Sequence, residues 1–191
     1  HGKLDALALS RELEQDSYRL LSVHSQAADR RQYLQRPDLG RRLDVASVER
    51  LKDVAATFSD GVDAVIAVAD GLSALAVERH ARPMLAELRP RLDRWTLGPL
   101  VIVEQGRVAI GGEIGELIRA SIVVVLIGER PGLSAPDSLG VYLTYAPRIG
   151  RTDAERNCIS NIRDGGLSYA VAAHRLYYLM AEAHRLRLSG V

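Results

Sequence analysis

The sequence contains a single cysteine, Cys158, among its 191 residues. One thiol cannot form an internal disulfide, and a chain without disulfides is typical of a reducing compartment. Long apolar runs are also missing, since the run at 122–127 is strand-sized and far shorter than the roughly 18 residues of a membrane-spanning helix. The first residues lack the basic start and apolar centre of a signal peptide. A cytoplasmic protein without a membrane span is therefore expected.

Lysine is scarce, with two lysines against 23 arginines. Arginine binds carboxylates and phosphates through two-point contacts and suits protein interfaces, although a coding bias of the source genome explains the same skew. The charges nearly cancel, at a formal net charge of +1, which argues against a dedicated nucleic-acid-binding protein. Hydrophobic residues make up 47% of the chain, which predicts a packed globule.

Familiar catalytic and binding motifs are absent as well. Gly106, Gly111 and Gly112 do not have the G-x-G-x-x-G spacing of dinucleotide-binding loops, and the chain has no G-x-x-x-x-G-K-[ST]. The five histidines are scattered without the spacing of a metal site. A lone cysteine such as Cys158, with no nearby histidine, is more typical of a small buried residue than of a nucleophile. We therefore expect no metal site and no catalytic residue.

What the sequence does contain is an alternation of apolar strands and amphipathic helices. Strands are predicted at 18–24, 62–69, 100–104, 122–127 and 141–145, and helices at 4–13, 45–58, 70–88, 108–120 and 168–187. Asp70 is expected to cap the helix that follows it, and Pro83 and Pro90 to break or kink that helix. The pattern predicts an α/β fold with a Rossmann-like, mostly parallel sheet flanked by helices.

Two polar segments interrupt this pattern. Residues 25–44 are Arg-rich and are expected to form a long loop, as are residues 152–163. Residues 1–44 then form a unit of N-terminal helix, strand and Arg-rich loop, and residues 45–191 an α/β domain, or the two together form one continuous domain.

Three segments with unusual composition are predicted at the carboxyl ends of strands, where open α/β sheets bind ligands. The segment 104–108 leads into a helix N-terminus, whose backbone N–H groups suit an anion or a polar amide, although an ordinary turn explains it too. In the segment 128–134, Glu129 can accept hydrogen bonds from a ligand or pair with an arginine such as Arg130. The third segment, 152–163, carries Cys158 among polar residues.

Long motifs in the sequence resemble one known family. GERPGLSAPDSLG and TDAERNCISNI, within residues 123–183, are similar to the small subunit of ethanolamine ammonia-lyase. VHSQAADRRQYLQRPDLGRRLD and GRVAIGGEIGE match the same family in order, so the resemblance covers nearly the whole chain. Compared with this family, we expect the N-terminal arm and the short C-terminal extension to be missing from the sequence.

This resemblance implies a subunit of an adenosylcobalamin-dependent lyase that converts ethanolamine to acetaldehyde and ammonia. In the family, a large subunit with a (β/α)₈ barrel holds substrate and carries the radical chemistry, and the small subunit contacts the cobalamin. The cobalamin-binding positions correspond to Val108, Glu129 and Cys158. The resemblance thus implies a hetero-oligomer, without activity from this chain alone, located in the cytoplasm or in a bacterial microcompartment. The absence of D-x-H-x-x-G fits a cobalamin whose tail base stays on the cobalt.

Two other functions compete with this interpretation. The Arg-rich segment 25–44 could dock a protein partner, which would make the chain a non-catalytic interaction or scaffold module. A free-standing nucleotide-binding enzyme is disfavoured by the missing phosphate motifs.

Overall fold

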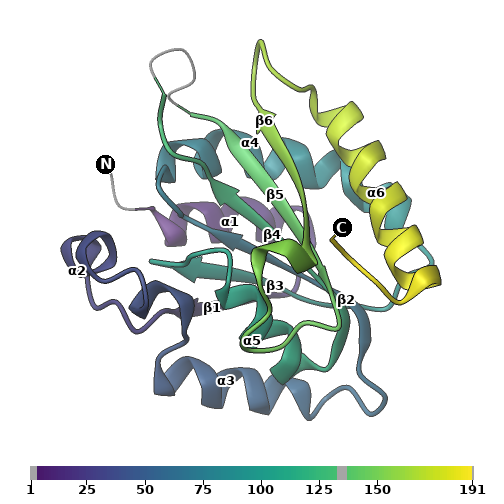
Figure 1. The fold of residues 1–191 in the computed structure, drawn as a ribbon, viewed down its shortest axis with the longest axis horizontal. Helices are drawn as coiled ribbons and strands as arrows, with labels where there is room; N and C mark the ends of the chain where they lie inside the picture. Colours follow the sequence, from purple (N-terminus) through teal and green to yellow (C-terminus); the bar gives the residue numbers. More distant parts are fainter. Residues whose placement is uncertain (1–3, 133–136, 191) are drawn as a thin grey trace.

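The computed structural model describes residues 4–132 and 137–190. Their centre is one six-stranded sheet with the strand order β1-β3-β2-β4-β5-β6, and helices lie on both of its faces (Figure 1). The strands are β1 (Leu20–His24), β2 (Val62–Ala69), β3 (Leu97–Glu104), β4 (Ala120–Gly128), β5 (Leu139–Tyr145) and β6 (Arg156–Ile162). The α-helices are α1 (Ala6–Gln15), α2 (Arg30–Gln35), α3 (Val45–Ala55), α4 (Ala74–Leu88), α5 (Ile110–Ile118) and α6 (Tyr169–Leu186).

The sheet has a parallel half and an antiparallel half. β1, β3, β2 and β4 pair in parallel, so their carboxyl ends meet at one edge, whereas β5 and β6 each run antiparallel to the preceding neighbour. The connection 129–138 is shorter than the dozen or more residues that a parallel crossover needs. The predicted α/β class is confirmed, and the predicted mostly parallel sheet is corrected to a mixed one.

The helices form two outer layers that bury different sides of the strands. Residues of α1, α4 and α6 share one apolar core with side chains such as Ile66, Ile102 and Val124. Residues of α3 and α5 share the other core with side chains such as Val65 and Val125. Burial on both faces explains why the central strands are apolar without interruption. No helix in the described ranges is long and apolar enough to cross a membrane.

The start of α4 differs from the prediction. Ser73, not Asp70, is its N-cap, and the Ser73 hydroxyl accepts a hydrogen bond from the backbone N–H of Ala76. Asp70 is instead turned toward the β3–α5 connection. Pro83 lies inside α4, which continues to Leu88, and Pro90 lies in the 3₁₀ turn that follows. Pro83 therefore does not break the helix, whereas α4 ends shortly before Pro90, as predicted.

Both segments that were predicted as loops contain regular structure. Residues 25–44 include α2 and a 3₁₀ turn at Leu39–Arg41, and residues 152–163 include a 3₁₀ turn at Asp153–Glu155 and the edge strand β6. α2 buries one side chain, Tyr33, and β6 buries only Ile159 and Ile162. Such elements carry little apolar periodicity, which explains why the sequence pattern did not predict them.

Candidate functional site

On the α5 side, the sheet is hollowed beside Tyr142 of β5. Val141 and Leu143 of β5 point into the core beneath α6, so Tyr142 between them points to the opposite side. There, two adjoining cavities of about 670 and 300 Å³ share three residues, Arg107, Val108 and Tyr142. We call the two together the Tyr142 groove. Tyr142 of β5 forms its floor, and its walls come from the Arg-rich segment and from the β2–α4, β3–α5, β4–β5 and β5–β6 connections.

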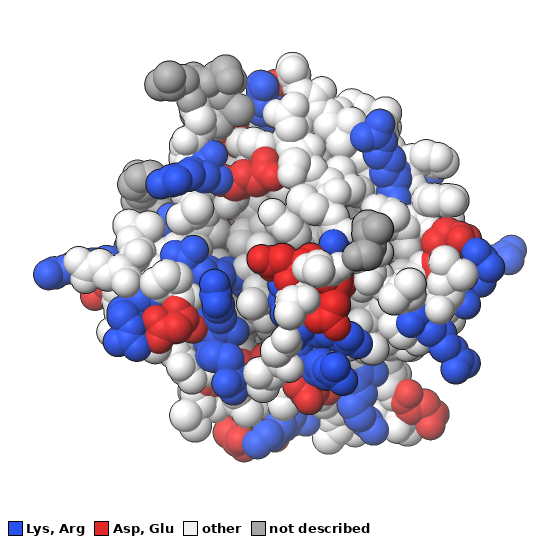
Figure 2. All heavy atoms as spheres, viewed as in Figure 1, with Lys and Arg blue, Asp and Glu red and all other residues white. Residues whose placement is uncertain are grey.

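The larger cavity is rich in arginine. Lys and Arg side chains gather on this face beside carboxylates (Figure 2). The charged residues lining the cavity are Asp38, Arg41, Arg42, Arg107, Arg151, Asp153 and Arg156. Some of these arginines are paired, because Arg42 makes a two-point contact with Glu113 at 3.0 and 3.1 Å and Arg151 pairs with Glu155. The Arg42 pair ties the Arg-rich segment to α5.

Arg107 belongs to a stack on the groove wall. The Tyr33 ring contacts two guanidinium groups, of Arg30 at 4.7 Å and of Arg107 at 4.5 Å from its centroid. The Tyr33 hydroxyl donates to the carbonyl of Gly106, and burial raises the pKa of Tyr33 to about 12. Nε of Arg107 is buried without a hydrogen-bond partner among the described residues. The stack therefore holds a cationic donor at the groove.

Asp70 fixes the connection that carries Val108. Its two carboxylate oxygens accept the backbone N–H groups of Gln105 at 3.1 Å and Gly106 at 3.0 Å. Burial raises the pKa of the Asp70 carboxyl, while those two N–H donors and the Arg30 guanidinium 3.7 Å away favour its charged form. The buried Asp70 carboxylate, directly after β2, thus positions the connection that leads from β3 into α5.

Two of the three predicted site residues line the Tyr142 groove. Val108 lies on the wall of both cavities, and Glu129, directly after β4, lies on the wall of the smaller one. Glu129 forms no ion pair within the described ranges. Its Oε2 instead accepts hydrogen bonds from the Ser138 hydroxyl and from the backbone N–H of Asn161, the latter at 3.2 Å.

Cys158 lines neither cavity of the groove. It lies within the edge strand β6, not on a loop at the carboxyl edge of the sheet as predicted, and it lines a separate cavity of about 420 Å³ beside α6. On β6 it is opposite Tyr142, so both side chains are on the same side of the sheet. Burial, followed by a side-chain hydrogen bond with Cys158, raises the pKa of the Tyr142 hydroxyl. Cys158 is exposed, with its Sγ 3.3 Å from the Ser160 hydroxyl, so the expectation of a buried cysteine is wrong.

Three groove residues were not singled out from the sequence. Arg107 precedes Val108, but an arginine among 23 carries little signal by itself. Tyr142 could have been found from the two-residue period of its strand, which places it opposite Val141 and Leu143. Tyr33 could not, because nothing local links it to Arg107, 74 residues away.

Comparison with known proteins identifies the family. The family model described as ethanolamine ammonia-lyase light chain matches residues 1–191. The chain belongs to this family. Three relatives in this family, each named ethanolamine ammonia-lyase small subunit, are matched along the whole chain over 193 residues. That of Pseudomonas aeruginosa (strain LESB58) is 61% identical, that of Pseudomonas putida (strain W619) 60%, and that of Ralstonia nicotianae 57%; the match covers 71%, 71% and 72% of their lengths.

The predicted resemblance is thereby confirmed, and the chain is a component of a lyase, the small subunit of an ethanolamine ammonia-lyase. A small subunit implies a large-subunit partner. No cluster of three or more His, Cys, Asp or Glu side chains suited to a metal ion occurs in the parts of the chain that the structure describes.

Proposed function

We propose that this light chain uses the Tyr142 groove to hold part of an adenosylcobalamin that it shares with the large subunit. The observation that carries the proposal is the convergence of Val108 and Glu129 on one cavity, with Cys158 on the strand beside its floor residue Tyr142. These are the positions at which the family resemblance implies cobalamin contacts. Separate segments of the sequence supply all three.

The size of the groove supports a shared cofactor. Pockets of about 300–1,000 Å³ suit drug-sized ligands. The two cavities, at about 670 and 300 Å³, fall in that range, whereas a corrin ring with its amide side chains and nucleotide tail is much larger. The groove therefore suits one portion of the cofactor, and the remainder would lie against the partner.

The polar groups of the groove fit the peripheral groups of a cobalamin. Arg107, with a buried Nε that lacks a partner among the described residues, can donate to an amide oxygen or to the phosphate of the nucleotide tail. Glu129 can accept from an amide N–H, and the exposed part of Tyr142 provides a flat apolar surface. Val108 adds an apolar contact beside the start of α5.

The roles of this chain are binding, orientation and exclusion of water, and its partner would hold the substrate. The chemistry supplied by the bound cofactor is cleavage of its cobalt–carbon bond, which initiates the conversion of ethanolamine to acetaldehyde and ammonia. We further propose a hetero-oligomer in the cytoplasm or in a bacterial microcompartment.

The proposal is tested in the complex of this chain with its large subunit. Glu129→Gln keeps the shape of the side chain but removes its charge and one acceptor, so the apparent Kd for adenosylcobalamin should rise about tenfold. The value of kcat at saturating cofactor should stay unchanged. Glu182→Gln on α6, which packs on the other face of the sheet, is the matched control and should leave both values unchanged.

A loss of kcat with intact cofactor affinity would contradict the proposal. The alternative of a protein-interaction module predicts that Glu129→Gln and Arg107→Ala leave cofactor affinity unchanged, while substitutions in the Arg-rich segment abolish co-purification with the large subunit. Cofactor binding by the groove therefore predicts a change in cofactor affinity, and a protein-interaction module predicts a change in co-purification.

A further inference from the structure

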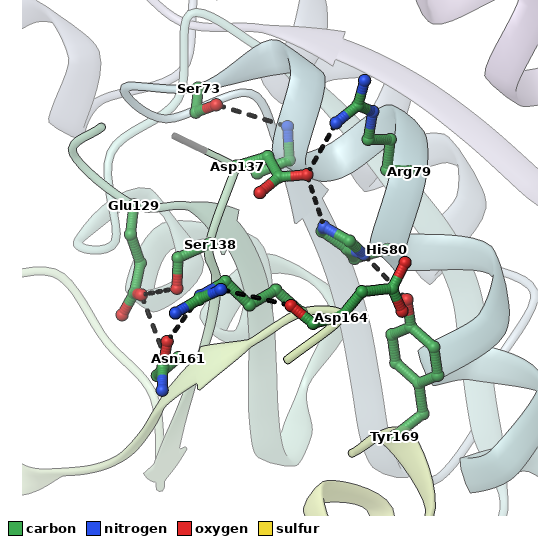
Figure 3. A network of polar contacts seen from close by, with 11 residues as sticks. Ser73, Arg79, His80, Glu129, Asp137, Ser138, Asn161, Asp164 and Tyr169 are labelled. Carbon is green, nitrogen blue, oxygen red and sulfur yellow. Dashed lines mark hydrogen bonds and ion pairs between the residues drawn. The ribbon is translucent and has the colours of Figure 1, made fainter. Parts of the chain in front are cut away.

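The Glu129 carboxylate is held on one side only. Its Oε2 accepts the two hydrogen bonds from Ser138 and Asn161, which Figure 3 shows converging on the same oxygen. Its Oε1 accepts no hydrogen bond from the described part of the chain. One oxygen is therefore fixed by protein donors, while the other keeps its lone pairs for a donor from outside.

Gly140 leaves room for this side chain to lie against β5. A Cβ atom at Gly140 would lie 2.8 Å from Oε1 and 3.1 Å from Cγ of Glu129. Any other residue at this position would push the carboxylate away from the strand, which gives Gly140 a local role in orienting Glu129.

Asp137, which precedes Ser138 in the chain, is held by a helix on the other face of the sheet. Oδ2 of Asp137 accepts from Nη1 of Arg79 at 2.9 Å and lies 3.2 Å from Nε2 of His80, and both partners belong to α4 (Figure 3). The Arg79 guanidinium beside Asp137 holds the pKa of that carboxyl below its usual range. The carboxylate thus ties the start of β5 to a helix.

His80 is itself fixed at both ring nitrogens. It is 2% exposed, and its Nδ1 lies 2.8 Å from the hydroxyl of Tyr169 at the start of α6. Each ring nitrogen thus has a partner, Nδ1 the Tyr169 hydroxyl and Nε2 the Asp137 carboxylate. The anchor of Asp137 is therefore built from two helices that pack against each other.

We propose that Asp137 is a positioning residue that fixes Ser138, and through Ser138 the Glu129 carboxylate, with one oxygen presented to the ligand. This rests on the proposed function, which makes Glu129 a cofactor contact. The path runs from α4 through the sheet edge to the Tyr142 groove and uses no contact between Asp137 and the cofactor.

The test uses the complex with the large subunit and adenosylcobalamin itself. Ser138→Ala removes one donor to Glu129, so the apparent Kd should rise roughly three- to tenfold while kcat at saturating cofactor stays constant. Asp137→Asn should act in the same direction, as should Gly140→Ala, which displaces the carboxylate. Ser59→Ala and Asp60→Asn, exposed residues between α3 and β2, are the matched controls.

Non-additivity separates positioning from a merely structural role. If Ser138 acts through Glu129, then Ser138→Ala should add nothing to the loss already caused by Glu129→Gln. Full additivity of the two losses would overturn the proposal. Ser138→Ala alone carries this test if Asp137→Asn prevents assembly.

Hydrogen exchange at the Asn161 amide measures the position of the Glu129 carboxylate without cofactor, because that amide donates to Glu129. Its protection should fall in Ser138→Ala and Asp137→Asn and stay constant in the controls. If Glu129→Gln weakens cofactor binding but neither variant alters affinity or exchange, the positioning role is wrong and the proposed function stands. If exchange responds but no variant changes affinity, the positioning role stands and Glu129 is not a cofactor contact.

Discussion

Single side chains hold the wall of the Tyr142 groove, and Tyr33 is the most enclosed of them. Tyr33→Leu removes both cation–π contacts and the hydrogen bond to Gly106, so the free energy of unfolding should fall by about 2–3 kcal/mol. Tyr33→Phe keeps the ring contacts and should cost about 1 kcal/mol. Urea unfolding of both variants measures the difference. Equal losses would mean that the hydroxyl, and not the ring, carries the contribution.

Glu155 provides a residue-scale prediction on pH. Hydrogen bonds from the Thr152 backbone N–H, then from Arg151 and the Thr152 hydroxyl, lower the pKa of Glu155 from its ordinary 4.5 to about 2. Because the folded pKa is lower than the unfolded one, the stabilising contribution is complete above about pH 4.5. It is lost as the pH falls through about 2. Carboxyl NMR titration should show this value, and Thr152→Ala should raise it.

At the scale of elements, the buried strands and the longer helices could be predicted. β2 occupies the residues predicted for it, because a strand buried on both faces must be apolar throughout. The sequence also indicated two groove residues, Val108 and Glu129, since both follow strands of the parallel half. Their role toward a cofactor came from the family resemblance, not from their spacing.

The elements that frame the groove could not be predicted. β6 reads RNCISNI, and its strand conformation depends on pairing with β5 rather than on an alternating apolar pattern. α2 is short and is held mainly through Tyr33. Tertiary contacts over long sequence separations determine both, and a local pattern does not contain them. The same holds for the tie between Arg42 and Glu113.

The β3–α5 connection gives an element-scale prediction through Asp70. In Asp70→Asn one acceptor oxygen becomes an NH₂ group that faces a backbone N–H of Gln105 or Gly106, so the free energy of unfolding should fall by about 1–3 kcal/mol. Hydrogen exchange at those two amides should rise. Asp44→Asn, at the N-cap of α3, is the matched control with almost no loss, since asparagine caps helices as well as aspartate. Equal losses in the two variants would contradict this role.

At the scale of the whole molecule, we propose that residues 1–44 and 45–191 form one cooperative unit. β1 pairs with β3 along five residues, and the Arg-rich segment is tied to α5 through Glu113. Urea unfolding followed by Trp95 fluorescence and by far-UV circular dichroism should therefore give coincident transitions. An early transition in one signal alone would indicate two separately folding parts.

Successive side chains of β5 face opposite sides of the sheet, so the residue that lines the groove depends on whether its position in the strand is odd or even. Val141 and Leu143 face the core under α6, while Tyr142 faces the groove. Inserting or deleting one residue in the middle of β5 would exchange the two sides for every position beyond it, presenting aliphatic side chains where the tyrosine now lies and turning a hydroxyl into the core. A change of two residues would restore the original facing. In this protein the number of residues along one strand thus decides which side chains line the groove.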